Sequence, residues 1–560
     1  MKSLFGNENS VLKRCSLPFL LSILIPTLGM SESAGSAERI YAFYSALKLS
    51  IPVTALERFA QKGEIDRDLS IYQQYLQPEQ IKDLHRVLTS PIKVHPAAVS
   101  QFLYTQQGEL LLRRLGEVIK TRPKKQKPGF YALRSALILA SQEPGGLTLL
   151  NVLRKYPTVS IYIDLARTLG IASELKEIVR QTNQAIATVS QQSEVEAAGL
   201  PFFHRNNIKI SNLRRSGKWK WQKIPPLRLL DLSRKRVLVT DVYIPETKNK
   251  APVIVISHGL GSDSSNFRYL ASHLASHGFA VIVPNHPGSN SKEWQELFNR
   301  RTEEVNKRNE FYDHPLDIKF ILDCLESYPN LNNRLNLEQV GVFGQSFGGY
   351  TALVLAGAKV DYIRLQKDCQ PQIVKQTLNL SLLLQCRAIK VEEINRIQDL
   401  RDQRVKAVIA VNPITSSVFG TSGLSQVQVP VMLVASSDDT VAPALYEQIL
   451  PFALINKRQK YLALIAGGTH FSVIGNGKQV SNALESPPQL MGDNPQQARS
   501  YMKSLSIPFF STYAVGKSQY KRYLNASYAK VISQHPMGLN IVKSLGNIDL
   551  VQKYKAKNSY

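Results

Sequence analysis

The chain has 560 residues, of which 43% are hydrophobic and 20% charged, which excludes a disordered chain and predicts two domains rather than one. Its 69 basic and 43 acidic residues give a formal net charge of +26. This excess favours anionic partners such as a membrane surface, although general solubility would explain it equally well. The basic residues do not alternate with aromatic ones in an arginine-rich tract, so no nucleic-acid partner is expected.

The first segment, residues 1–37, is predicted to be a signal peptide. Lys13 and Arg14 precede an apolar run at 17–28, and the small residues 35–37 form a cleavage site. The apolar run is too short to span a bilayer comfortably. The chain is therefore expected to be exported, to the periplasm or outside the cell. A retained segment that associates the protein with the membrane is the alternative.

Residues 38–200 are predicted to form a mainly helical N-terminal domain. Residues 40–44 and 47–53 could pair as a short hairpin, after which Thr54 and Glu57 have the spacing of a capping box at a helix start. Apolar residues then recur every three or four positions, which indicates amphipathic helices. These helices are expected at 72–88, 99–119, 131–140 and 147–153.

A linker is predicted at 201–226, followed by a domain at 227–515 in which short apolar runs replace the helical pattern. Residues 227–232 and 237–244 are expected to form an antiparallel hairpin. Further strands are predicted at 252–257, 279–284, 340–343, 405–411, 429–435 and 461–466. Continuous apolar strands separated by helices are typical of a doubly wound, mostly parallel α/β sheet.

Two further segments interrupt or follow this pattern. Residues 359–404 form a helical insertion at the position expected for a lid, and residues 516–560 form a predicted basic C-terminal tail. The insertion contains Cys369 and Cys386, which an exported protein could oxidise to a disulfide. Free thiols, like that of Cys324, are the alternative, and the sequence leaves both open.

The segment around Ser346 carries the strongest chemical motif. An apolar strand leads into Gly344-Gln345-Ser346-Phe347-Gly348, and a helix-forming run follows. In this G-x-S-x-G pattern the serine occupies a strained turn, and the flanking glycines avoid collisions with neighbouring backbone. Ser346 is therefore the predicted nucleophile, at the positive N-terminus of a helix.

A nucleophilic serine needs a base and an acid, which should follow it in the order acid, then histidine, each after a strand. Asp438 and Asp439 follow one strand, and Asp439 has the usual spacing of three residues before Pro443. His470 follows the next strand, whereas His535 has no strand before it. Asp439 and His470 are therefore the predicted acid and base.

The oxyanion formed during acyl transfer needs two backbone N–H donors. The residue after the nucleophile, Phe347, supplies one, and Leu260, in the loop after the predicted strand 252–257, is the expected source of the other. The preceding His258 and Gly259 are interpreted as structural residues of this loop. His258 is expected to hold the loop by hydrogen bonds rather than to act as a base.

These motifs together resemble the platelet-activating-factor acetylhydrolase and dienelactone-hydrolase-like branch of the α/β-hydrolases. The resemblance covers roughly residues 227–480 and rests on four stretches, at 258–261, 275–279, 317–323 and 344–349. The N-terminal region is similar to a domain of unknown function that precedes such hydrolases in cyanobacteria. Residues 281–290 resemble that group more than the animal enzymes, and Ser346 replaces the cysteine of dienelactone hydrolases.

The resemblance implies a serine hydrolase that cleaves carboxylic esters through an acyl-enzyme, without metal or cofactor. It implies an esterase or lipase, or an acetylhydrolase-like enzyme of lipid degradation, with an ester or phospholipid as substrate. The basic surface and the lid-like insertion add an anionic membrane surface as a candidate partner. A peptidase, a polyester hydrolase and a non-catalytic binding protein with the same architecture are the alternatives.

Overall fold

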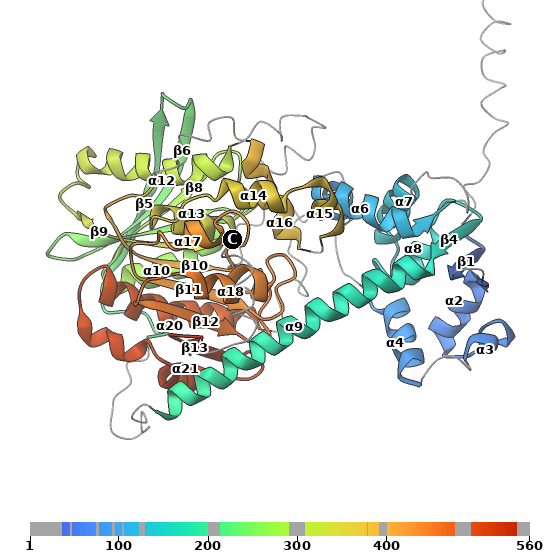
Figure 1. Cartoon of the computed structure of the whole chain (residues 1–560). Coiled ribbons are helices and arrows are strands. Elements are labelled where there is room, and N and C mark those ends of the chain that lie inside the picture. The colour runs from blue at the N-terminus through green and yellow to red at the C-terminus, as the bar shows by residue number, and fades with distance from the viewer. Residues whose placement is uncertain are drawn as a thin grey trace, which may run out of the picture. The chain divides into compact units, whose positions relative to one another are not determined.

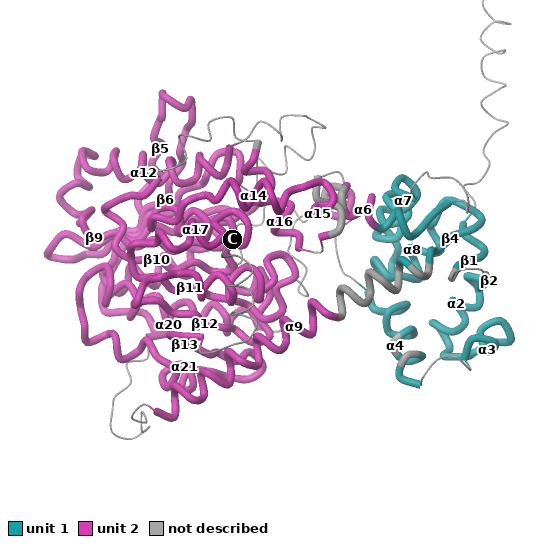
Figure 2. The backbone as a smooth tube through the Cα atoms, viewed as in Figure 1, with its two compact units in different colours: residues 1–92, 115–168 teal, residues 93–114, 169–560 magenta. Residues whose placement is uncertain are grey.

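Of the predicted signal peptide, the computed structural model describes only residues 36 and 37. The described residues are 36–44, 47–73, 78–91, 96–103, 106–121, 129–199, 213–290, 309–377, 379–390, 400–475 and 494–545. They form two compact units (Figure 2), an N-terminal unit of residues 1–92 and 115–168 and a C-terminal unit of residues 93–114 and 169–560. No helix in these described segments combines the length and apolarity needed to cross a membrane.

The N-terminal unit contains a four-stranded sheet in the order β2-β1-β4-β3. β1 (Arg39–Tyr44) and β2 (Leu47–Pro52) pair as the predicted hairpin, β4 (Ser160–Asp164) lies parallel to β1, and β3 (Ile119–Lys120) is short. The mainly helical prediction did not include β3 and β4. The helices of this unit are α2 (Val53–Lys62), α3 (Arg67–Gln73), α4 (Pro78–Thr89), α7 (Phe130–Ser141) and α8 (Leu149–Arg154).

The predicted capping box at Thr54 is wrong. α2 begins at Val53, directly after Pro52 ends β2, and no side chain caps the helix. Thr54 therefore lies inside the first turn, where its hydroxyl is no longer at the position that caps the free N–H groups.

Three further helices are α5 (Pro96–Leu103), α6 (Gln106–Val118) and α9 (Leu165–Ala198), of which α9 is 34 residues long. Beyond Thr168, α9 belongs to the C-terminal unit. Ala185 and Val189 join the core of that unit, and the Ser193 hydroxyl accepts a hydrogen bond from the Ile541 amide. Residues 169–198, which the sequence assigned to the first domain, thus belong to the second.

The C-terminal unit is built on a nine-stranded sheet in the order β13-β12-β11-β10-β9-β7-β8-β6-β5. The six strands from β12 to β8 in this order are parallel, and the β12–β13, β8–β6 and β6–β5 pairs are antiparallel. The mostly parallel α/β sheet predicted from the sequence is therefore confirmed. The strands are β5 (Trp221–Asp231), β6 (Arg236–Pro245), β7 (Ala251–Ser257), β8 (Ala280–Asn285), β9 (Leu335–Gln345), β10 (Val405–Val411), β11 (Val431–Ser436), β12 (Lys460–Ile465) and β13 (Leu539–Val542).

Helices cover both faces of this sheet (Figure 1). On β7, Val253 and Val255 enter one hydrophobic core while Ile254 and Ile256 enter the other, because successive side chains of a strand point to opposite faces. The first core includes α12 (Glu310–Ser327), α13 (Phe347–Leu355), α17 (Gly420–Leu424) and α18 (Leu450–Leu454). The second includes α10 (Arg268–Ser276), α20 (Pro495–Tyr513) and α21 (Ala526–Ile532).

Two boundaries drawn from the sequence need correction. The predicted linker at 201–226 includes the start of β5, whose first residue is Trp221. The predicted tail at 516–560 includes α21 and β13, which pairs antiparallel with β12 and buries Leu539 and Ile541 in the core. A four-residue strand is too short for its alternation to be read from the sequence.

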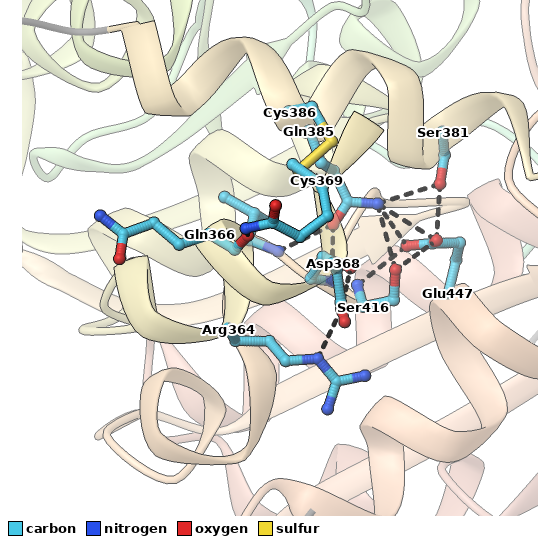
Figure 3. The surroundings of a disulfide bond; sticks show 12 residues. Arg364, Gln366, Asp368, Cys369, Ser381, Gln385, Cys386, Ser416 and Glu447 are labelled. Atoms are coloured by element: carbon cyan, nitrogen blue, oxygen red, sulfur yellow. Dashed lines mark hydrogen bonds and ion pairs between the residues drawn. A yellow bond between two sulfur atoms is a disulfide. The ribbon is translucent and has the colours of Figure 1, made fainter. Parts of the chain in front are cut away.

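The insertion at 359–404 contains α14 (Tyr362–Asp368), α15 (Pro371–Gln376), α16 (Leu380–Gln385) and the 3₁₀ helix η3 (Cys386–Lys390). A disulfide joins Cys369 to Cys386 (Figure 3), which decides the alternative that the sequence left open. Beside it, the buried Glu447 carboxylate, on the π-helix η5 (Leu445–Ile449), accepts hydrogen bonds from Ser381 and Gln385 of α16. This contact fixes the insertion to the helical segment that follows the Asp439 loop.

Candidate active site

Ser346 lies in the sharp turn between β9 and α13, with φ 56° and ψ −117°. The left-handed φ is strained for a residue with a side chain. The flanking glycines permit it: a Cβ on Gly344 would lie 1.9 Å from the carbonyl oxygen of Gly348, and a Cβ on Gly348 would lie 2.0 Å from that of Ser257. This is the strand–turn–helix geometry that the G-x-S-x-G pattern predicts.

His470 and Asp439 form a hydrogen-bonded chain with this serine. The His470 Nε2 lies 2.9 Å from the Ser346 Oγ, and its Nδ1 lies 2.7 Å from the Asp439 Oδ2. The other Asp439 oxygen accepts the amides of Val441 at 2.9 Å and Ala442 at 2.7 Å. Because the carboxylate is held by the loop that follows β11, it fixes the orientation of the imidazole.

The two rival residues weighed from the sequence lie elsewhere. Asp438 is exposed, and its carboxylate accepts a hydrogen bond from the neighbouring Ser437 hydroxyl. His535 is exposed in the segment between α21 and β13. The structure therefore brings Asp439 and His470, rather than Asp438 or His535, to Ser346.

Sequence reasoning missed the residues that position the histidine loop. The Gln345 Nε2 donates to the His470 carbonyl oxygen at 3.1 Å, and the Asn412 Nδ2 donates to the same oxygen at 3.3 Å. Both side chains are buried. The available signal was the position of Asn412, a polar residue directly after the apolar strand β10, where this fold places its functional loops.

The predicted oxyanion loop lies against the serine. A Cβ on Gly259 would lie 2.9 Å from the Cβ of Ser346, so only a glycine lets this loop approach so closely. The His258 Nδ1 donates to the Gly259 carbonyl oxygen at 2.8 Å. Because a trans peptide directs its C=O and N–H to opposite sides, this hydrogen bond fixes the direction of the Leu260 N–H. Phe347 is the first residue of α13, where helix amides have no partner within the helix.

His258 is held in its neutral form. Its Nε2 accepts a hydrogen bond from the His286 amide at 3.1 Å, which leaves the proton on Nδ1. Burial, with His286 beside it, lowers the pKa of His258 to about 3. The imidazole is fully buried, so the structure agrees with a structural role and not with that of a proton shuttle.

A buried polar network supports this loop from behind. The His286 Nδ1 lies 3.0 Å from the Asp317 Oδ2, and its Nε2 lies 3.0 Å from the Ser257 hydroxyl at the end of β7. Burial alone would raise the pKa of the Asp317 carboxyl, but the His286 hydrogen bond and the Arg236 charge outweigh it and lower the pKa. Asp317 is thus an ionised acceptor that fixes the His286 ring.

A second connection anchors the far side of the loop. The Gly261 amide donates to the Ser289 carbonyl oxygen at 2.8 Å, and the Ser289 hydroxyl lies 2.8 Å from the His314 Nε2. The His314 ring stacks on that of His286, with centroids 3.8 Å apart. Buried polar groups that are hydrogen-bonded in this way give a loop one well-defined conformation.

Two family models match the chain. The model described as an alpha/beta hydrolase of unknown function (DUF1400) matches residues 36–164, and a model of the alpha/beta hydrolase fold matches residues 252–364. Together with the sheet order and the strand–turn–helix geometry at Ser346, these matches establish that the chain is an α/β-hydrolase. The first match covers the N-terminal unit, in agreement with the predicted hydrolase-associated domain.

Within this class the chain is similar to platelet-activating factor acetylhydrolases. The enzyme of Canis lupus familiaris is 31% identical over 142 residues, which cover 19% of this chain and 32% of that enzyme. The enzymes of Cavia porcellus and Bos taurus are 28% and 27% identical, with the same coverage. The similarity therefore spans about a third of the length of these relatives.

Proposed function

We propose that this protein is a serine hydrolase that cleaves carboxylic esters through an acyl-enzyme. The observation that carries the proposal is the continuous chain from the Ser346 hydroxyl through His470 to Asp439. His470 takes the serine proton as Oγ attacks the ester carbonyl, and then gives that proton to the leaving alcohol. Water, deprotonated by the same imidazole, attacks the acyl-enzyme and releases the acid and free Ser346.

We assign the stabilisation of the tetrahedral oxyanion in each half-reaction to the backbone N–H groups of Leu260 and Phe347. Support for this assignment comes from the contact between Gly259 and Ser346 and from the hydrogen bond that directs the Leu260 peptide. Fixed donors of this kind stabilise the transition state because they need no reorganisation when the charge develops.

The proposed substrates are esters of moderate size, including the short acyl chain of a phospholipid. The similarity to platelet-activating factor acetylhydrolases favours this class. The net charge of +26 favours an anionic lipid surface as the place of action, and the insertion at 359–404 would act there as a lid. Export through the N-terminal segment is part of the same proposal.

The test is hydrolysis of p-nitrophenyl esters from acetate to palmitate by the full chain, beside Ser346→Ala. Ser272→Ala is the matched control, because among the described residues the Ser272 hydroxyl bonds only to the Tyr269 carbonyl, within α10. Activity on short chains that disappears in Ser346→Ala alone is the expected result. A preference for palmitate would indicate a lipase. Absence of any Ser346-dependent turnover on esters would contradict the proposal, and peptides and polyesters would be tried next.

A further inference from the structure

The N-terminal unit has a cavity of about 330 Å³ between its sheet and its helices, partly open to solvent. The lining residues come from one face of the sheet, for example Ile40, Ala42 and Ile161, and from the facing helices, for example Leu56, Leu133 and Leu153. The volume falls in the range of pockets that bind small molecules. Every lining residue belongs to this unit, so the cavity is separate from the site at Ser346.

The lining specifies the kind of ligand. Apart from Tyr72, Gln73 and Tyr156, it consists of hydrocarbon side chains, and Phe59 is the one aromatic ring among these. Water finds few hydrogen-bond partners in such a space, and covering this apolar surface with a ligand is favourable. A flexible aliphatic chain matches this lining better than a planar aromatic or polar molecule.

The cavity is partly open to solvent, because Leu149 in its lining is 41% exposed and Gln73 is also exposed. A charged head group can therefore stay in water while an apolar chain is buried, which avoids burying a carboxylate without a partner. Tyr156 contributes its ring to the lining. Its buried hydroxyl lies against the backbone of Gly129, where a Cβ would be 2.7 Å away, and so does not face the ligand.

We propose that the N-terminal unit binds a single-chain amphiphile of the fatty-acid class. The aliphatic chain fills the cavity, and the carboxylate stays in solvent at the open side, beside the exposed Gln73 and Leu149. This binding goes beyond the proposed esterase activity and does not depend on it, since no residue of the cavity belongs to the C-terminal unit.

The test is titration of the full chain with the fluorescent fatty acid cis-parinaric acid, followed by displacement with dodecanoate. Saturable binding of one probe per chain is expected. Ala42→Phe, which fills the cavity from β1, and Val152→Phe, which fills it from α8, should each weaken binding at least about 10-fold.

The control is Tyr131→Ser, because Tyr131 is 78% exposed and does not line the cavity. It should bind the probe as the unmodified chain does, and hydrolysis of p-nitrophenyl acetate should be unchanged in Ala42→Phe. The proposal is overturned if the unmodified chain shows no saturable binding. It is also overturned if folded Ala42→Phe and Val152→Phe both bind normally, because the probe would then lie elsewhere.

Discussion

The candidate site at Ser346 and the cavity of the N-terminal unit have opposite chemistry. At Ser346 buried polar side chains are hydrogen-bonded to one another, as His470 is to Asp439. In the N-terminal cavity the lining is almost entirely hydrocarbon. Directional hydrogen bonds hold reacting atoms in place, as catalysis requires, whereas an apolar cavity selects ligands by size and hydrophobicity. We therefore assign chemistry to the C-terminal unit and chain binding to the N-terminal unit.

The largest effect is expected when Asp439 is substituted, and this substitution tests the division of roles between the two units. Asp439→Asn removes the acceptor that orients His470 and stabilises its protonated form, so kcat for p-nitrophenyl acetate should fall about 10,000-fold. Ala42→Phe in the N-terminal cavity should leave kcat unchanged. Comparable losses in both variants would contradict the division of roles between the units.

A smaller effect is expected behind the oxyanion loop, at His258. His258→Leu removes the hydrogen bond to the Gly259 carbonyl, so the Leu260 amide loses its fixed direction and kcat should fall about 10-fold to 100-fold with little change in KM. His258→Asn keeps a donor near the Nδ1 position and should recover part of the loss. A normal kcat in folded His258→Leu would show that His258 does not position the loop.

Removing the disulfide tests how much the insertion contributes to the stability of the C-terminal unit. Cys369 and Cys386 are separated by 17 positions, and opening a loop of this length should lower the free energy of unfolding by about 3 kcal/mol. Urea denaturation of Cys369→Ser/Cys386→Ser measures this loss, with Cys324→Ser as the control. An equal loss in the control would mean that thiol substitution, and not the open loop, destabilises the protein.

The smallest effect concerns the response to acid. Burial, with neighbouring His277 and Lys503, lowers the pKa of His273 to about 3. Since the unfolded chain then binds this proton first, near pH 6.5, His273 reduces stability as pH falls from about 6.5 to about 3. Between pH 6 and 4, the free energy of unfolding measured by urea denaturation should therefore depend less steeply on pH in His273→Leu. The expected difference in slope is about 1.4 kcal/mol per pH unit. Parallel curves would show that His273 is not buried in its neutral form.

The sequence predicted most of the C-terminal sheet because its strands are continuous apolar runs. It also placed Ser346, Asp439 and His470 in the loops where the structure finds them, since their order and strand-end positions follow from local pattern. It did not predict β13 or the support of His258 by His286 and Asp317. These features depend on pairings between segments far apart in the chain, which no local periodicity records.

The measurement that tests the central claim most directly is reaction of the full chain with a fluorophosphonate, followed by mass mapping of its peptides. A serine activated by His470 should give one adduct, on the peptide that contains Ser346. The adduct should be absent in Ser346→Ala and unchanged in Ala42→Phe. An unlabelled Ser346 in folded protein, or a principal adduct on another serine, would contradict the account.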